Sequence, residues 1–573
     1  MLFQNKAHTA TVSFIILLAF LLLFCSRATE QTGDSLAYAP AAKTGREMFH
    51  PHHLLFTPVV RGLFLAISSM CEWCDVICVG QIHNIMWAIV AVLSFYSVAK
   101  CVLDSNTAAM FASILFLVTQ GIWQFSTQVE VYVPATGCLA LLAARMIRRR
   151  DVRLTILDMT VISLLLVVSV LYHQTNILFC IPLGTYLVAT QARKARVAAI
   201  VLSLAGLIVV STYTLIFLLT SDGRTPDEFL RFCLSYTFHP NPTWGTFEKF
   251  SVVGVSDLVK SQVWNLVAIP LPILHLLRSS TTALAMSLSV IFLLSIVVLS
   301  WNIVQIVHRA AHATIRTFLL VWLATYFIFF LWWSPGEREF FVVTLFPLLL
   351  LFCAVVKDIA ERFGRAHGSR KITSAVIALL TITAVTLNHR DVAALHQSKG
   401  PAYRQAATLD RLVPEKCLIL TDYIVLKNRN YYFGRVKVIE VQMPLLLFYQ
   451  HKPVPQWDHV KREECIIVSL SYVAPEYTIT GFNAYSHSSE WVAFVEWLFN
   501  FEYDSDGTSG SVREFEVITD EKGEAYIVLS ASRMKVSGFN ELLQALDNRM
   551  SLRGNMNVSP FGMWLSTMDS DDE

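Results

Sequence analysis

The sequence predicts a polytopic α-helical membrane protein with about eleven transmembrane helices, followed by a small C-terminal α/β domain. Three observations carry this prediction. Only 15% of the 573 residues are charged and 54% are hydrophobic, whereas about a quarter of the residues are charged in an average soluble protein. The deficit falls on residues 1–387, in which long apolar stretches repeat. Residues 388–573 instead have the mixed composition of a soluble domain.

A helix that crosses a bilayer needs about 20 apolar residues, with about 17 as the lower limit. The first candidate is interpreted as an uncleaved signal anchor rather than a cleaved signal peptide, because no small-residue cleavage motif follows it. Residues 264–277 (WNLVAIPLPILHLL) are short and contain two prolines, so we expect a re-entrant or interfacial element there. The candidate spans are residues 11–26, 80–101, 107–124, 130–147, 154–172, 175–191, 197–220, 281–307, 317–333, 340–357 and 372–388.

The orientation follows from the basic residues in the short loops. Clusters of Arg and Lys follow the fourth, sixth, eighth and tenth spans, whereas the loops at 126–130 and 172–175 contain neither residue. Cytoplasmic loops are enriched in Lys and Arg, so the N-terminus is predicted to lie inside and the C-terminal domain outside. The outer face then collects the loops 27–79 and 221–261 together with the C-terminal domain.

The first outer loop is the segment richest in candidate functional groups. A polar turn near its start contains Asp34, which is interpreted either as a turn residue or as a general base whose pKa would be raised by burial. Residues 46–56 form an amphipathic segment that we expect to lie along the membrane surface. Three histidines lie in the run 48–58 (MFHPHHLLFTP), namely His50, His52 and His53.

An acidic residue soon after the first span, followed by an interfacial helix with a His-Pro element, resembles the GT-C glycosyltransferases. These integral-membrane enzymes use polyprenyl-phosphate sugars and include protein O-mannosyltransferases, aminoarabinose transferases and Rgt-type transferases. The resemblance covers roughly residues 10–360 and is supported by QVEVYVP at 128–134, YHQT at 172–175 and LWWSPGEREFF at 331–341. The chain departs from this family in having no acidic pair in its first outer loop, which argues against a metal-assisted reaction.

The resemblance implies transfer of a hexosyl or pentosyl group from a polyprenyl-phosphate donor to a glycan, lipid or protein acceptor on the extracytoplasmic face, with inversion. Asp34 would be the general base, Arg338 would bind the leaving phosphate and Glu130 would orient the acceptor or a basic partner. The alternative interpretation of Arg338 is a surface ion pair with its acidic neighbours, and that of each histidine is an interfacial anchor. The further candidates for substrate binding are Arg46, His50, His52, His53, His173 and Glu337.

Other functions leave fewer marks in the sequence. A net charge of +2 without a basic aromatic patch gives no indication of nucleic-acid binding. His52 and His53 would point apart on a helix, so no metal site is predicted and a divalent cation is not indicated. A transporter or flippase of a lipid-linked or small polar substrate is the main rival, but it should show repeats and ionisable groups at mid-membrane. Asp158 is the ionisable residue that we assign to the inside of a span. It lies near the cytoplasmic start of the fifth span, and we expect it to pair with an Arg of the basic loop. An O-antigen polymerase or ligase, relying on Arg and His, is a third hypothesis.

The predicted partners are therefore a lipid-linked sugar donor, membrane lipids and an acceptor, and the predicted location is a bacterial inner membrane. The transmembrane part is assigned to residues 1–387 and the α/β domain to residues 388–555, with a disordered tail at 556–573. Acceptor recognition, a lid and an inert cap are the roles considered for this domain. Its expected strands are residues 417–426, 436–441, 465–473, 513–519 and 525–531, and its expected helices are 489–501 and 539–547.

Overall fold

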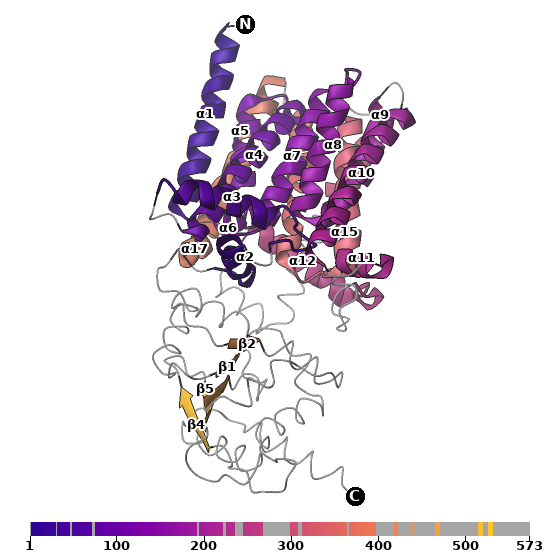
Figure 1. Cartoon of the computed structure of the whole chain (residues 1–573). Coiled ribbons are helices and arrows are strands. Elements are labelled where there is room, and N and C mark those ends of the chain that lie inside the picture. Colours follow the sequence, from indigo (N-terminus) through magenta and orange to yellow (C-terminus); the bar gives the residue numbers. More distant parts are fainter. Residues whose placement is uncertain are drawn as a thin grey trace, which may run out of the picture. The chain divides into compact units, whose positions relative to one another are not determined.

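The computed structural model divides the chain into two compact units, residues 1–398 and 399–573 (Figure 1). In the first unit it describes residues 2–396 apart from gaps at 30, 46–47, 72–74, 192–193, 222–224, 235–244, 268–297, 307–311 and 364–365. In the second unit it describes five strands. The expected helices at 489–501 and 539–547 and the tail at 556–573 lie outside the described residues.

The first unit is a helical bundle whose long helices run side by side (Figure 1). Stacked aromatic rings fill its core: Phe95 lies 4.7 Å from Phe116, and Trp322 lies 5.2 Å from Phe346, between ring centroids. The helices of the bundle are α1 (Leu2–Cys25), α4 (Val76–Leu103), α5 (Asn106–Leu117), α6 (Gln120–Ser126), α7 (Tyr132–Arg148), α8 (Ile156–Tyr172), α9 (Cys180–Thr190), α10 (Lys194–Thr220), α15 (Ala313–Trp333), α16 (Val342–Phe363) and α17 (Ala366–Leu395).

Every expected span except 281–307 coincides with one or two of these helices, with the 3-10 helix η1 (Gln174–Phe179) preceding α9. Among the described residues, five helices are long and apolar enough to cross a membrane, or six if the pair α5 and α6, bent by 61°, is one span. The bundle is thus that of a multi-pass membrane protein, and the count of eleven stays a prediction. Most of 281–307, and the second half of 264–277, lie outside the described residues.

One end of the bundle, here called the basic end, carries the loops that are rich in Arg and Lys. Asp158, in the first turn of α8, pairs with Arg145 of α7 at 2.5 Å, as the sequence predicts. Lys357 of α16 reaches Asp104, between α4 and α5, at 2.6 Å. Arg316 of α15 reaches Asp358 at 2.8 Å. These contacts bring loops that are distant in sequence to the same end.

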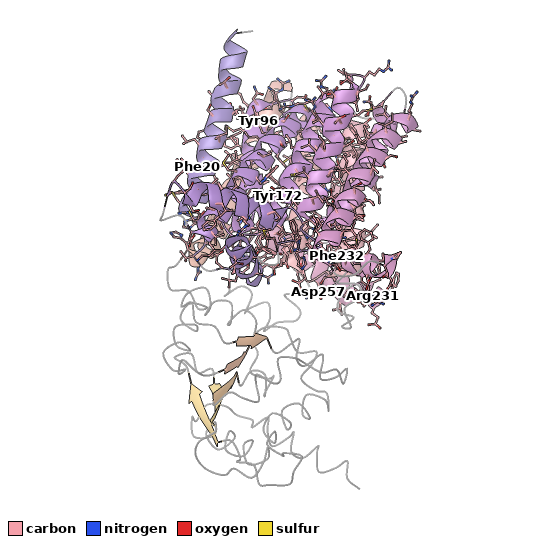
Figure 2. All side chains as sticks on the ribbon, in the orientation of Figure 1. Phe20, Tyr96, Tyr172, Arg231, Phe232 and Asp257 are labelled. Carbon is pink, nitrogen blue, oxygen red and sulfur yellow. The ribbon has the colours of Figure 1, made fainter. Side chains whose placement is uncertain are left out.

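The opposite end, here called the site end, carries the short helices α2 (Gly33–Thr44), α3 (Phe56–Ser68), α11 (Pro226–Cys233) and α12 (Val252–Leu266) (Figure 1). Figure 2 labels Arg231, Phe232 and Asp257 there. The far end of α17 also lies at the site end, because the His396 imidazole hydrogen-bonds the Arg27 carbonyl oxygen at 2.6 Å. The first unit therefore begins α1 at the basic end and finishes α17 at the site end.

Two local expectations in the first outer loop are wrong. The segment from Thr32 is a helix and not a polar turn: Thr32 is the N-cap of α2, and its hydroxyl accepts a hydrogen bond from the Ser35 amide at 3.0 Å. Such caps stabilise a helix by about 1 kcal/mol. Residues 48–55 are turns, and the helix α3 begins only at Phe56. Pro51 disfavours helical geometry at His50, the residue before it.

The second unit contains a five-stranded mixed sheet in the order β2-β1-β3-β5-β4. β1 (Leu418–Thr421) pairs in parallel with β2 (Val438–Glu440) and β3 (Cys465–Ser469). β4 (Glu514–Thr519) and β5 (Ala525–Ser530) form the antiparallel hairpin that the turn residues between them predict. The strands fall within the expected ranges, whereas the complete α/β domain stays a prediction.

Candidate active site

The N-terminus of α2 is tied to the loop between α6 and α7, and this places Asp34 beside Glu130. The Thr32 hydroxyl donates to Glu130 Oε1, and the Ser35 hydroxyl accepts from the Val129 amide at 3.2 Å. Asp34 lies in the first turn of α2, where a negative charge interacts favourably with the helix dipole. Two acidic side chains that are distant in sequence thus share one location.

Two amide side chains of α4 hydrogen-bond the loop segments that carry this arrangement. Gln81 Nε2 donates to the carbonyl oxygens of Ala28 and Thr127, at 2.6 and 2.9 Å. Asn84 Nδ2 donates to the carbonyl oxygen of Glu130 at 2.7 Å. Both amide side chains are buried, so their bonds form away from water and fix the two loop segments relative to α4.

The histidines His50, His52, His53 and His173 form a second group, here called the imidazole cluster. The ring of His53 stacks on that of His50, with 4.6 Å between centroids, and lies 5.8 Å from that of His173. The Tyr38 hydroxyl of α2 lies 2.9 Å from His53 Nε2 and 3.4 Å from Asp34 Oδ2. Tyr38 therefore links the imidazole cluster to Asp34.

The turn that carries the histidines is clamped by its backbone. The Tyr213 hydroxyl of α10 donates to the Pro51 carbonyl oxygen at 2.7 Å. The His52 carbonyl oxygen accepts from the Gln174 amide at 2.9 Å, and the Leu55 amide donates to the Leu171 carbonyl oxygen at 3.0 Å. A turn fixed from two neighbouring helices holds its side chains in one orientation, as a preorganised site requires.

Glu339, in the 3-10 helix η3 (Arg338–Phe341), completes what we call the carboxylate cluster, with Asp34 and Glu130. Glu130 is only 2% exposed and lies outside the helix α7 that follows it. Burial raises the pKa of Glu130 well above its usual range, and the neighbouring charges of Asp34 and Glu339 raise it further. Glu130 Oε2 is buried and has no hydrogen-bond partner among the described residues.

The imidazole cluster is kept neutral. Burial lowers the pKa of His52 to about 3 and that of His173 to about 4. Burial lowers the pKa of His50, and it lowers the pKa of His53 well below the usual value, with further lowering from the three neighbouring imidazoles. The cluster therefore offers neutral donors and acceptors at neutral pH rather than positive charge.

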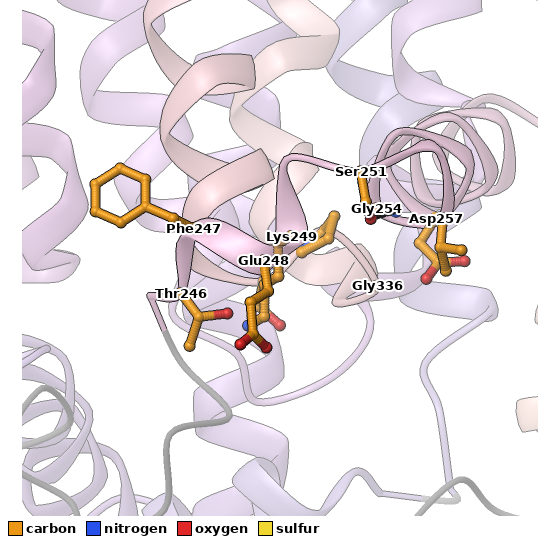
Figure 3. A pocket seen from close by; sticks show the side chains of 11 residues that line it. Thr246, Phe247, Glu248, Lys249, Ser251, Gly254, Asp257 and Gly336 are labelled. Atoms are coloured by element: carbon orange, nitrogen blue, oxygen red, sulfur yellow. Dashed lines mark hydrogen bonds between the residues drawn. The ribbon is translucent and has the colours of Figure 1, made fainter.

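Two cations of the site end, Arg338 and Lys249, lie near the carboxylate cluster: Arg338 precedes Glu339 in η3, and Lys249 and Glu339 both interact with Glu337. The exposed Arg338 places its guanidinium over the Trp264 ring, 4.7 Å from the centroid. Lys249 lines an open pocket of about 780 Å³ formed by the segment 246–257 and the loop 334–336 (Figure 3). Lys249 Nζ donates to the Trp333 carbonyl oxygen at 2.6 Å, and its pKa is lowered by burial, against the charge of Glu337.

The sequence-predicted residues thus separate into groups. Asp34, His50, His52, His53, Glu130 and His173 meet in the two clusters. Glu337 lies beside Glu339 of the carboxylate cluster, Arg338 lies over Trp264, and Arg46 lies outside the described residues. Sequence reasoning missed Tyr38 and Lys249, and it gave Glu339 only as an acidic neighbour of Arg338. No group of three or more His, Cys, Asp or Glu that could hold a metal ion is found among the residues the structure describes.

Comparison with known proteins supports the fold. ArnT from Cupriavidus metallidurans, bound to undecaprenyl phosphate, is similar with a TM-score of 0.53 at 10% identity, over 91% of this chain and 98% of that one. Its apo form gives 0.53 at 12% identity, over 92% and 98%. The apo oligosaccharyltransferase of Archaeoglobus fulgidus gives 0.50 at 12% identity, over 83% and 71%. No protein-family model and no curated protein sequence matches.

These neighbours are glycosyltransferases of the GT-C superfamily. At such low identity the likeness concerns the fold, and it confirms the resemblance drawn from the sequence at that level. The chain thus has the fold of a multi-pass GT-C membrane protein, and its function has to be argued from its own residues.

Proposed function

We propose that the protein is a membrane glycosyltransferase that transfers a sugar from a polyprenyl-phosphate donor to an acceptor on the extracytoplasmic face. The observation that carries the proposal is the meeting of Asp34, Glu130 and the imidazole cluster at the end of the bundle opposite the basic loops. A neighbour of the same fold has undecaprenyl phosphate bound. A lipid phosphate anchored in the outer leaflet would reach this end.

Asp34 is the proposed general base. The acceptor oxygen attacks the anomeric carbon, and its proton passes to the Asp34 carboxylate. The bond between the anomeric carbon and the phosphate oxygen breaks, and the phosphate keeps the electron pair. A single displacement of this kind inverts the anomeric centre. Asp34 is half-buried at the start of a helix, and a positioned base of this type contributes about 10²–10⁴-fold to the rate.

The leaving phosphate needs positive charge, and two cations of the site end are proposed to supply it. Arg338 is exposed beside Trp264, and Lys249 lines the pocket next to the loop that leads to Arg338. Guanidinium and ammonium groups form strong charge-assisted bonds to phosphate oxygens. Glu130, whose pKa burial raises well above its usual range, is proposed to orient the acceptor together with His53 and His173.

The acceptor is proposed to be a glycan, a lipid or a protein, and the transferred group a hexosyl or pentosyl unit. The second unit is proposed to be extracytoplasmic and to recognise the acceptor or cover the site. Its support is that α17, the last helix of the first unit, ends beside Arg27 at the site end. A bacterial inner membrane, with the basic loops in the cytoplasm, is the proposed location.

The test is donor turnover by the purified protein in nanodiscs, with polyprenyl-phosphate hexosyl and pentosyl donors. Asp34→Asn is expected to lower kcat by about 10²–10⁴-fold. Asp227→Asn is the matched control, because Asp227 lies in an exposed ion pair on α11, and it is expected to keep full activity. Arg338→Ala is expected to weaken donor use, seen mainly as a higher KM. Full activity of Asp34→Asn would disprove the base assignment, and a wild type inert toward all donors would refute the function.

A further inference from the structure

Tyr38 lies between the proposed base, Asp34, and a buried histidine, His53. Its hydroxyl is 3.4 Å from Asp34 Oδ2 and 2.9 Å from His53 Nε2. The Tyr38 ring packs edge-on against Phe56 at 5.4 Å. The side chains of Tyr38 and His53 are 8% and 5% exposed, so this chain of contacts forms with little competition from water.

With Asp34 ionised and accepting from Tyr38, the numbers of donors and acceptors allow one arrangement of the protons. An ionised carboxylate only accepts, and the tyrosine hydroxyl has one proton to donate. If Tyr38 donates to Asp34, its oxygen must accept from His53, which then carries its proton on Nε2. His53 Nδ1 is left with a lone pair, and this atom is buried and has no partner among the described residues. The opposite tautomer would take the Tyr38 proton away from the ionised Asp34.

We propose that Tyr38 and His53 are positioning residues for the transfer, with His53 Nε2–H donating to Tyr38 and the Tyr38 hydroxyl donating to Asp34 Oδ2. This proposal rests on the proposed function. The arrangement holds the carboxylate in one orientation and stabilises its charged form. It also leaves His53 Nδ1 as a buried acceptor for a substrate hydroxyl. No proton moves along the chain, because Asp34 receives the acceptor proton and Tyr38 keeps its own.

The backbone of the turn keeps His53 in this orientation. The His53 amide donates to the His50 carbonyl oxygen at 2.9 Å, and its ring stacks on that of His50. Titratable groups surround the pair from the turn itself, the α6–α7 loop, α7, the end of α8 and η3. They are His50, His52, Glu130, Tyr132, His173 and Glu339.

The experiment is a set of pH–rate profiles for Tyr38→Phe, His53→Leu and His53→Gln beside the wild type. Tyr38→Phe keeps the ring against Phe56 and removes only the donor. We expect this variant and His53→Leu to lose about tenfold in kcat, the effect of one hydrogen bond to a charged group. Their acidic limb is expected to move to higher pH, because a carboxylate without its donor holds its proton more tightly. His53→Gln retains an N–H donor and is expected to restore most of the rate.

Tyr213→Phe is the matched control, since its hydroxyl clamps the same turn through the Pro51 carbonyl oxygen. It is expected to lower the melting temperature and to leave the acidic limb in place. The surrounding groups titrate in every variant, so the difference between profiles reports on the Tyr38 bond. An active wild type whose acidic limb coincides with that of Tyr38→Phe would overturn the positioning role and leave the base assignment standing. A wild type inactive with every donor would instead remove the proposed function and this inference with it.

Discussion

The two ends of the helical bundle treat buried charge in opposite ways. At the basic end, Asp158 lies 2.5 Å from Arg145 and Asp358 lies 2.8 Å from Arg316. At the site end, Glu130 lies among other carboxylates and hydrogen-bonds the neutral Thr32 hydroxyl. Both ends remove an acidic group from water. Asp158 at the basic end has an opposite charge beside it, whereas the contacts that the structure describes for Glu130 at the site end are with a neutral hydroxyl and with other carboxylates.

The difference in pairing has an energetic consequence for the two ends. A paired carboxylate recovers part of its desolvation cost from its partner, whereas an unpartnered buried polar atom costs about 1–3 kcal/mol. At the site end such atoms include Gln31 Oε1, His53 Nδ1, Gln128 Oε1 and Glu130 Oε2, each buried without a partner among the described residues. If the proposed function holds, a bound substrate with several hydroxyl groups would satisfy these acceptors. Within the described part of the chain, unpartnered buried atoms also occur elsewhere, for example Arg145 Nε and Arg316 Nε at the basic end.

The largest expected effect comes from breaking a pair at the basic end. Arg316→Leu removes a guanidinium that is 5% exposed and leaves Asp358 with its Trp301 hydrogen bond but without its ionic partner, while Asn302 Oδ1 loses the bond that Arg316 donates. We expect a loss of about 3–5 kcal/mol in the free energy of unfolding, with the rate per folded molecule unchanged. Tryptophan fluorescence during denaturation measures the first quantity and donor turnover the second.

Arg231→Leu is the control for this prediction, because its pair with Asp227 is exposed and such pairs contribute at most about 1 kcal/mol. The double variant Arg316→Leu/Asp358→Leu should recover only part of the loss, since an apolar pair replaces an ionic one while Trp301 Nε1 and Asn302 Oδ1 lose these partners. Equal destabilisation by Arg316→Leu and Arg231→Leu would erase the contrast between buried and exposed pairs.

The sequence predicts one end of this comparison better than the other. Lengths of apolar stretches and the distribution of Arg and Lys depend on the bilayer itself, so the helices and the basic loops could be located. The pairing of Asp158 followed from the cost of an isolated charge within a span. Asp34, His53 and Glu130 could be assigned to one face by the same threading, without any knowledge of their contacts.

The finer geometry of the site depends on side-chain direction, which threading does not determine. Glu337, Arg338 and Glu339 are consecutive, and only the 3-10 helix η3 directs Glu339 toward Glu130 and Arg338 over Trp264. The sequence pattern does not identify Tyr38 as a site residue, because it predicts a turn where the structure has the helix α2. In a helix, residues 34 and 38 lie on the same face, so the capping residue Thr32 was the signal that could have found it.

The second-largest expected effect is a loss of folding stability at acidic pH, caused by the imidazole cluster. Unfolded histidines bind protons below a pKa of about 6.5, whereas His52 and His173 in the folded protein have pKa values of about 3 and 4. Protonation therefore favours the unfolded state, and stability present above pH 6.5 is lost progressively as the pH falls toward 4. Melting temperatures measured between pH 7.5 and 5 should fall accordingly.

His173→Gln supplies the comparison for the acid prediction. It removes one of the protons that the unfolded chain takes up, so its melting temperature should depend less steeply on pH than that of the wild type. Parallel pH dependences for the two proteins would show that the cluster titrates equally in both states and is open to water.

The smallest effect is expected at Glu130, and it has the opposite sign. Burial raises its pKa in the folded state, so the unfolded carboxyl releases its proton first as the pH rises, and stability is lost above the unfolded pKa of about 4.3. Glu130→Gln stays neutral and keeps an oxygen for the Thr32 hydroxyl. Its melting temperature should match the wild type near pH 4 and exceed it increasingly toward pH 8.

Because the amide also imitates the protonated carboxyl, transfer activity should persist in Glu130→Gln and fall in Glu130→Leu. A stabilised variant without activity would mean that the ionised form of Glu130 takes part in the reaction, and the site end would then hold two working carboxylates in place of one.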